Sequence, residues 1–345
     1  MAGLPIILAS QNAAPSGLLS ISPPVLFFLL GALATMVRSN IVIPKAITKL
    51  LSLYLLWAIG FRGGVELADS GLTGEAARAI GLAVALALVT PVVAYAVLRR
   101  VTQRPLAAAM AACYGSVSVV TFLTACASLD QASTPFGGHM VAAMALMEAP
   151  AIVIALALLR VDESRAAVRG LAAPLPKASG GMRPRWGRLL HEALLNGPVV
   201  LLLGSLAIGM LTGERGYAAF KPLCTDVFPG VLAFFLLDLG LIAARRLPHV
   251  LRGPVAQPIF AVVAPLCFAA LAIGAARGLG IAPGDAVLLA VLAASASYIA
   301  APAALRLAVP QADPGLYVSY ALGVTFPFNI TAGIPLYTAA VKWLW

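Results

Sequence analysis

Two stretches, GSVSVVT at residues 115–121 and SASYIAAPAAL at residues 295–305, decide how this chain folds. Each places small and hydroxylated residues in the middle of a long apolar segment. Lipid cannot hydrogen-bond exposed backbone groups, so polar and irregular segments at that depth survive only inside protein or beside a watery cavity. Each stretch therefore predicts a helix that is interrupted near the centre of a membrane protein.

The composition of the whole chain predicts an all-α, polytopic membrane protein. Of its 345 residues, 61% are hydrophobic and 10% are charged, against roughly 25% charged in a soluble domain. Apolar runs of about 20 residues are long enough to cross a bilayer as helices. We count ten such runs, at 23–37, 44–65, 74–98, 105–127, 138–160, 189–212, 222–243, 253–276, 284–305 and 315–344.

The distribution of basic residues predicts the orientation of these spans. With ten spans and both termini outside, 17 of the 23 lysines and arginines fall in inner loops or the central loop. This excess is the positive-inside signature of a membrane protein. Topology and lipid contact therefore explain the net charge of +10, and we predict no binding of nucleic acid.

The motifs of soluble enzymes are missing from the sequence. There is no GxSxG, P-loop, HExxH or GxGxxG pattern. The four cysteines and three histidines are scattered and show no metal-ligand spacing. We predict no enzyme activity, no cofactor and no metal other than a coupling sodium ion.

One long polar loop, at residues 161–188, divides the chain into two halves of five spans each. An odd number of spans forces the second half to enter the membrane from the opposite side. Short matches at a nearly constant offset indicate a duplication, as for LGALA at 30–34 and LGSLA at 203–207. We predict a first repeat over 1–160, a basic cytoplasmic linker, and a second, inverted repeat over 189–345.

A pair of interrupted spans, one in each half, is typical of the binding site of a secondary transporter. An interrupted helix directs free N–H groups and the positive end of its dipole toward the cavity, where they would hold an anion. Freed carbonyls on the other half-helix would hold sodium. The alternative for the serine and threonine hydroxyls is a hydrogen bond to a carbonyl of the preceding helical turn. For Tyr298 the alternative is a hydrogen bond to a nearby carbonyl. The predicted substrate-binding residues are Gly115, Ser116, Ser118, Thr121, Ser295, Ser297 and Tyr298.

Glu148, in the segment MEAPAIV, is the strongest single polar residue. A carboxylate near the middle of the membrane is costly and is functional by default. We predict that Glu148, with Ser118 and Ser297, couples transport to a cation, either by binding sodium or by carrying a proton. The alternative is a structural role, in which Glu148 accepts a hydrogen bond from a freed amide.

Three other polar residues lie in predicted spans. Asp238 is placed like Glu148 but in a less polar segment, and Asn329 would line the cavity. Arg62 lies near an outer span end, where it either extends to the interface or attracts anions to the entrance.

Blocks along nearly the whole chain resemble the sodium-dependent bicarbonate permeases of cyanobacteria and their bacterial relatives. They are collinear and match in spacing. The blocks are SPPVLFFLLGALA at 22–34, IPKAITKLLSLYLLWAIGFRGGVEL at 43–67, YGSVSVVTF at 114–122, MEAPAIVIA at 147–155, EALLNGPVVLLLGSLAIGMLTG at 192–213 and SASYIAAPAALRLAVPQADPGLY at 295–317.

The resemblance implies a five-plus-five inverted repeat, a homotrimer, and uptake across the bacterial inner membrane. It also implies an anion site where two discontinuous core helices meet. In cyanobacterial members it further implies a cytosolic PII-like regulator. The leading prediction is a secondary active transporter that imports a small anion, most simply bicarbonate, with sodium by alternating access.

Several positions depart from the family pattern. Val119 and Val120 replace a Gly-Ser pair, Tyr298 replaces an acidic residue, and Glu148 replaces an aspartate with its charge kept. These changes remove candidate ligands and make the site drier, which leaves a small organic carboxylate, driven by sodium or protons, as an alternative substrate. A non-transporting membrane sensor is a second alternative. An intramembrane enzyme is a third, and it would need an acid–base pair converging on one cavity.

Overall fold

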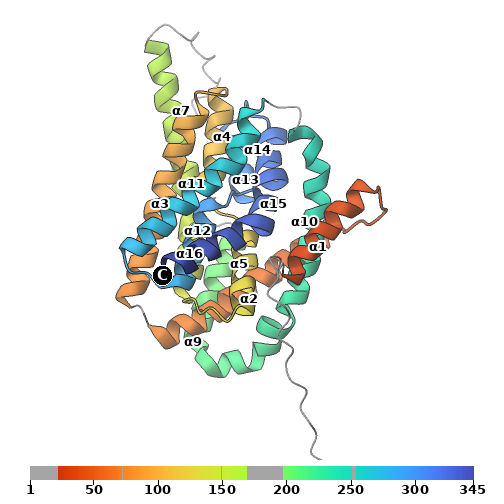
Figure 1. Cartoon of the computed structure of the whole chain (residues 1–345), viewed down its shortest axis with the longest axis vertical. Helices are drawn as coiled ribbons and strands as arrows, with labels where there is room; N and C mark the ends of the chain where they lie inside the picture. Colours follow the sequence, from red (N-terminus) through yellow and green to blue (C-terminus); the bar gives the residue numbers. More distant parts are fainter. Residues whose placement is uncertain (1–21, 72, 149, 169–196, 251–253) are drawn as a thin grey trace, which may run out of the picture.

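The computed structural model describes residues 22–71, 73–148, 150–168, 197–250 and 254–345. All regular secondary structure within these ranges is helical (Figure 1).

The helices of the first half are α1 (Pro23–Met36), α2 (Lys45–Ser70), α3 (Gly74–Leu98), α4 (Arg104–Gly115), α5 (Val119–Gln131), α6 (His139–Glu148) and α7 (Pro150–Val168). The described helices of the second half are α9 (Gly197–Lys221), α10 (Phe228–Val250), α11 (Ala256–Gly278), α12 (Pro283–Ala294), α13 (Ala300–Ala308), α14 (Pro314–Tyr320), α15 (Phe326–Phe328) and α16 (Ile334–Leu344). Short π-helical turns join some of these: η1 (Pro222–Asp226), η2 (Ala321–Thr325) and η3 (Asn329–Gly333).

Within the described residues, eight stretches of helix are long and apolar enough to cross a membrane. Two shorter apolar helices, Pro23–Met36 and Pro283–Ala294, occupy the first and ninth predicted spans. The prediction of an all-helical polytopic membrane protein is therefore confirmed. The first span is short because its helix begins at Pro23, a residue suited to the first position of a helix, and ends at Met36. The ninth is short because the helix ends at Ala294.

One group of helices, which we call the paired layer, consists of α1, α2, α9 and α10, with η1. Within it α1 packs along α10 and α2 packs along α9. A side chain on Gly31 or Gly240 would overlap the backbone of the facing helix, and the same holds for Gly64 and Gly209 in the second pair. Small residues on both faces let these backbones touch, which is a common way for helices to associate in membranes.

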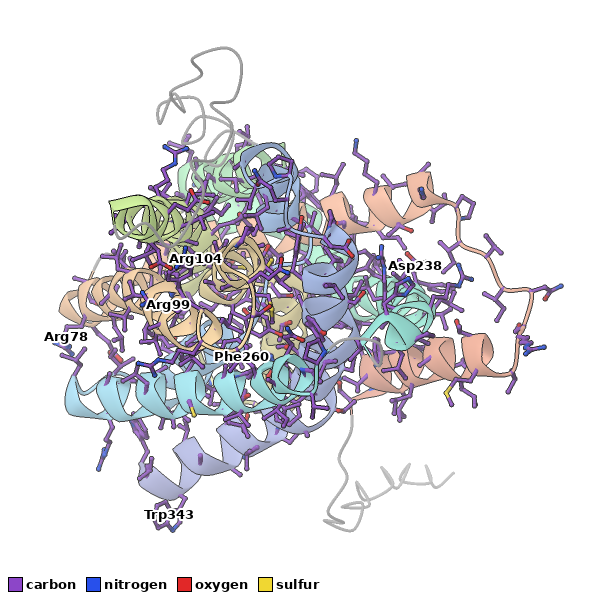
Figure 2. The ribbon with its side chains drawn as sticks, turned by 90° about the horizontal axis from the view of Figure 1, so that it is seen from above. Arg78, Arg99, Arg104, Asp238, Phe260 and Trp343 are labelled. Carbon is purple, nitrogen blue, oxygen red and sulfur yellow. The ribbon has the colours of Figure 1, made fainter. Side chains whose placement is uncertain are left out.

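The remaining helices form a second group, which we call the main body. Its centre is occupied by α4 and α12, in which every residue over 107–115 and 284–294 is buried. A helix that is apolar on all sides belongs in the interior of a large protein. Helix α3 packs against α4, α6 and α7, and α11 packs against α12. Seen from above, Asp238 of α10 lies on the side opposite Arg78 of α3 and Trp343 of α16 (Figure 2).

Ion pairs at one end of the main body join the α3–α4 turn to α7. Arg99 and Arg104, both labelled in Figure 2, place guanidinium nitrogens 3.5 and 3.2 Å from the Asp162 carboxylate. The Tyr95 hydroxyl donates to the same carboxylate at 3.1 Å. Helix α7 continues to Val168, into the segment predicted as linker. Residues 169–188 of that linker and residues 189–196 of the predicted second repeat lie outside the described residues.

Candidate binding site at two interrupted helices

The first interruption separates α4 from α5. Helix α4 ends at Gly115, where a side chain would overlap Pro91 and Ala151, and the backbone at Ser116 is extended. Helix α5 begins at Val119 behind an N-cap, because the Ser118 hydroxyl oxygen accepts a hydrogen bond from the Thr121 amide at 3.3 Å. The Thr121 hydroxyl also donates to Ser118 Oγ, at 2.9 Å. A serine cap of this kind satisfies one of the free amides at a helix start.

The second interruption separates α12 from α13 and uses the same local chemistry. Helix α12 ends at Ala294, and the backbone at Ser295 is extended. The Ser297 hydroxyl accepts a hydrogen bond from the Ala301 amide at 3.2 Å. Pro302 follows at a position where its missing N–H costs nothing, because the first turn of a helix has no internal acceptor for it.

The two interruptions are hydrogen-bonded to each other. The Ser297 amide donates to the Cys113 carbonyl at 2.8 Å. In the other direction, the Ser118 amide donates to Ser295 Oγ at 2.9 Å, and that hydroxyl donates to the Leu292 carbonyl at 2.9 Å. The first link joins two backbone groups directly, and the second passes through the Ser295 hydroxyl. We call this arrangement the crossing.

The two links of the crossing correspond to each other along the chain. Ser118 and Ser297 are 179 positions apart, and so are Cys113 and Leu292, whose carbonyls accept from the Ser297 amide and from the Ser295 hydroxyl. Each serine also accepts from an amide in the first turn of the helix that follows, three positions along for Ser118 and four for Ser297. The two interruptions are therefore built with similar local bonds.

Tyr298 lies at the crossing and leaves a donor without an acceptor. Its side chain is 9% exposed, and its hydroxyl makes no hydrogen bond of ordinary geometry to a described residue, although Ser118 lies close to it. Its ring packs edge-to-face on Phe326 at 5.4 Å, and Phe326 packs in turn on Phe28 of α1 at 5.5 Å. The crossing is thus connected to the paired layer by a row of aromatic rings.

Further free donors lie at the start of α5. The amides of Val119 and Val120 make no hydrogen bond within the described residues, because the chain before them is extended and supplies no carbonyl four positions back. Two free amides at the positive end of a helix dipole, directly after Ser118, and one buried phenol hydroxyl close to Ser118 therefore lie at the crossing. This combination of neutral donors suits a small anion.

Glu148 is placed beside the first interruption. The Ser116 hydroxyl donates to the Glu148 backbone carbonyl at 2.9 Å. The side chain is 7% exposed, and its carboxylate makes no hydrogen bond or ion pair with a described residue. A buried charge without a partner is costly, so this carboxylate needs a proton or a cation.

The half-helix carbonyls that we predicted to be free for sodium accept protein donors instead. The Cys113 carbonyl accepts from the opposite interruption, and the Leu292 carbonyl accepts from Ser295 of its own interruption, as described above. The Ala294 carbonyl accepts from the Asn329 side-chain amide at 2.8 Å, and Asn329 accepts from the Tyr337 hydroxyl at 2.9 Å. Within the described residues no group of three or more His, Cys, Asp or Glu side chains is placed to hold a metal ion.

The crossing does not include every polar residue singled out in the sequence. Asp238 of α10 belongs to the paired layer, where its carboxylate accepts from the Thr48 hydroxyl of α2 at 2.6 Å (Figure 2). Sequence reasoning missed Phe326, which forms one wall beside Tyr298. Nothing in the local pattern FPF distinguishes that ring from any other apolar residue of the span.

Arg62 lies apart from the crossing, at a cavity of about 520 Å³ between the paired layer and α5. Three carboxylates share this cavity with the arginine. Its lining comprises Arg62, Val65, Glu66, Ala127, Asp130, Gln131, Glu214, Tyr217, Cys224, Thr225, Phe228 and Pro229. With three acidic side chains against one basic side chain, the predicted role of Arg62 in attracting anions is not favoured by its surroundings.

Comparison with known families gives one match. The model of the Na+-dependent bicarbonate transporter superfamily matches residues 23–342, which is most of the chain. No protein among those of curated function matches this chain.

Proposed function

We propose, on the premise that this chain belongs to the Na+-dependent bicarbonate transporter superfamily, that it is a secondary active transporter that imports a small anion with sodium. Membership of a transporter family implies that it is not an enzyme. Bicarbonate is the first candidate substrate, and the crossing is the proposed site.

The observation that carries this proposal is the set of unsatisfied donors at the crossing. The Tyr298 hydroxyl and the amides of Val119 and Val120 lack acceptors within the described residues. Of these donors the Tyr298 hydroxyl is fully buried, whereas Val119 is only partly buried. A buried side-chain donor without an acceptor is rare in native proteins, because it loses its bonds to water without replacement. An anion would satisfy all three at once and would interact favourably with the helix dipole.

The serines of the crossing have supporting roles in this proposal. Ser118 and Ser297 hold the starts of α5 and α13, and Ser295 joins the two interruptions. Gly115 allows the first interruption to lie close to neighbouring helices. Thr121 bonds to Ser118 and so fixes the orientation of its hydroxyl.

The cation would be held beside the anion. Ser116 ties Glu148 to the first interruption, two residues from Ser118. We propose that the Glu148 carboxylate, with the hydroxyls of Ser118 and Ser297, binds sodium, since hard cations take oxygen ligands. Having opposite charges together lowers the cost of burying either one. A proton on Glu148 is the competing form of coupling.

Two inverted repeats, over 1–160 and 189–345, would provide alternating access. The helix pairings support this arrangement: exchanging α1 with α9 and α2 with α10 converts the α1–α10 pair into the α9–α2 pair. The corresponding links of the crossing support it as well. We propose that the main body moves against the paired layer around the crossing, in the bacterial inner membrane with both termini outside and the linker 161–188 inside.

Two assembly features are proposed from the resemblance alone. They are a homotrimer and regulation by a cytosolic PII-like protein. A small organic carboxylate remains the alternative substrate, and the rings of Tyr298 and Phe326 favour it because they offer an apolar surface next to the free donors.

The first experiment is uptake of labelled bicarbonate into proteoliposomes, with and without an inward sodium gradient. Sodium-dependent accumulation is expected. Labelled acetate under sodium and proton gradients tests the alternative in the same vesicles. Binding without accumulation of either compound would replace the transport proposal with that of a sensor.

Removing one oxygen tests the anion site directly. Tyr298→Phe keeps the ring contact with Phe326 and deletes the free donor, so substrate affinity should fall about 10- to 100-fold, the range expected for a hydrogen bond to a charged group. Tyr320→Phe is the matched control, because that buried tyrosine donates to Gln257 outside the crossing. Equal affinities in the two variants would place the anion elsewhere.

A further inference from the structure

Arg62 connects the two groups of helices through its side chain. It belongs to α2 of the paired layer, and two of its nitrogens donate to the two carboxylate oxygens of Asp130 on α5, at 2.6 and 2.9 Å. The guanidinium carbon also lies 5.7 Å from the centre of the Phe136 ring, in the segment before α6. Both partners belong to the main body, so this one side chain is held from two sides by the opposite group.

The third donor of Arg62 stays within the paired layer. Its Nε donates to Glu66 Oε1, one turn further along α2, at 2.8 Å. Glu66 lies on the same helix as Arg62 and therefore moves with it. If Asp130 moved away, the guanidinium would still have a carboxylate beside it, which lowers the cost of separating Arg62 from Asp130.

The surroundings of this pair combine a cavity with a close contact. The cavity of about 520 Å³ is lined by both groups and includes Arg62, Glu66 and Asp130. Beside it the backbone of α2 nearly touches the chain just before α6, since a side chain on Gly138 would overlap the Gly63 carbonyl. The two groups are thus in contact at one edge of an open space, and the ion pair lies at that edge.

We propose that the bidentate Arg62–Asp130 pair is a latch that holds the paired layer and the main body in the arrangement seen here. The latch opens when the two groups move apart at the cavity, and Glu66 then keeps Arg62 paired. Only the statement that the latch opens once in each transport cycle rests on the proposed function; its effect on the arrangement of the two groups does not.

The exposure of the pair is suited to a latch that opens. The side chains of Arg62 and Asp130 are 23% and 40% exposed. The bidentate geometry fixes the relative orientation of the two side chains. Because the pair is partly exposed, water and salt weaken their attraction. A fully buried pair would make separation far more costly, because removing one partner would strand a charge.

The experiment measures the distance between the two groups. Spin labels are placed at Ala132→Cys, beyond the end of α5, and at Arg215→Cys on α9, after the exposed Cys267 has been replaced by alanine. Asp130→Asn and Arg62→Gln should each reduce the population at the wild-type distance at least twofold. The charge swap Arg62→Asp with Asp130→Arg should restore at least half of that loss.

Glu66→Gln is the matched control. The substitution removes a carboxylate that pairs with Arg62 but leaves the Arg62–Asp130 bond between the paired layer and the main body intact. The distance distribution should therefore remain that of the wild type. High ionic strength should act on the unmodified pair in the same direction as Asp130→Asn. Unchanged distances in both single variants would overturn the latch, and so would an equal effect of Glu66→Gln. Because the readout needs no transported substrate, a failure of uptake would count against the proposed function and not against the latch.

Discussion

The crossing and the latch both join separate parts of this molecule, but they do so with different chemistry. The crossing uses neutral hydrogen bonds between buried groups, and its strongest links run from backbone amides to a carbonyl and a hydroxyl. The latch uses charged side chains that are partly exposed beside a cavity. The first arrangement is costly to break, because each buried polar group would lose its only partner. The charged side chains of the latch exchange their protein partners for water at little cost.

This difference suggests a division of labour. The crossing lies within the main body and keeps the two interruptions at a fixed separation. The latch lies between groups that we propose to move. Buried hydrogen bonds hold the two interruptions together, and the partly exposed ion pair joins the two groups of helices that we propose to separate. The following predictions test that division, in order of decreasing expected effect.

The largest effect is expected at Glu148. Glu148→Gln removes the buried charge that needs a cation while keeping the size of the side chain, so uptake driven by an ion gradient should fall to the level of empty vesicles. The protein should still elute as a folded species with a wild-type melting temperature, since the carboxylate has no partner among the described residues. Normal driven uptake would remove the proposed role of Glu148 in coupling.

The next effect is on stability at the first interruption. Gly115→Leu forces a side chain into Pro91 and Ala151, and overpacking of this kind costs about 1–3 kcal/mol. Thermal unfolding in detergent measures the loss. Gly81→Leu on α3 is the control, because a side chain there meets open space. If both variants melted alike, the crossing would not be the tightly packed region described here.

A smaller effect is expected for the two capping serines. Ser118→Ala and Ser297→Ala should each cost about 0.5–2 kcal/mol of stability, as the loss of a cap does, and by similar amounts because each serine accepts from an amide in the first turn of the helix that follows. Ser118→Ala should in addition weaken substrate binding, measured by calorimetry. Ser205→Ala, which loses only a bond to the preceding turn of α9, is the control. A large inequality between the two caps would argue against similar local bonds at the two interruptions.

The smallest effect on stability is expected at the latch. Arg62→Gln should change the free energy of unfolding by less than about 1 kcal/mol, since the pair is partly exposed. Its melting temperature should also depend less on salt than that of the wild type. A loss as large as that of Gly115→Leu would mean that Arg62–Asp130 is a structural bond and not one that opens.

Much of the fold was predictable because its signals are local. The membrane class follows from composition. Runs of apolar residues predicted ten spans, and the described residues hold eight stretches of helix long enough to cross a membrane and two shorter apolar helices. The two interruptions were visible at Gly115, Ser116 and Ser118 and at Ser295 and Ser297, since hydroxyls inside an apolar run are costly unless protein surrounds them. The family was also recognisable from collinear blocks, and the match over residues 23–342 confirms it.

Other features of the site had no local signal. The carbonyls expected to be free for sodium accept protein donors, which the opposite interruption, Ser295 and Asn329 supply. The partner of Arg62 is Asp130, on a different helix, and nothing near either residue in the sequence indicates the other. Tyr298 was recognised as unusual, but the absence of an acceptor for its hydroxyl depends on everything packed around it.

The sequence by itself therefore determined that this protein lies in a membrane, that its spans are helical, and where two of its helices stop. Those properties depend on the cost of placing each side chain or backbone group in lipid, which is set residue by residue. Only the tertiary structure decided which donors find acceptors, from the saturated Cys113 carbonyl to the free Tyr298 hydroxyl, and which helices Arg62 joins. Such pairings connect residues far apart in the chain, and they are set by how the helices pack.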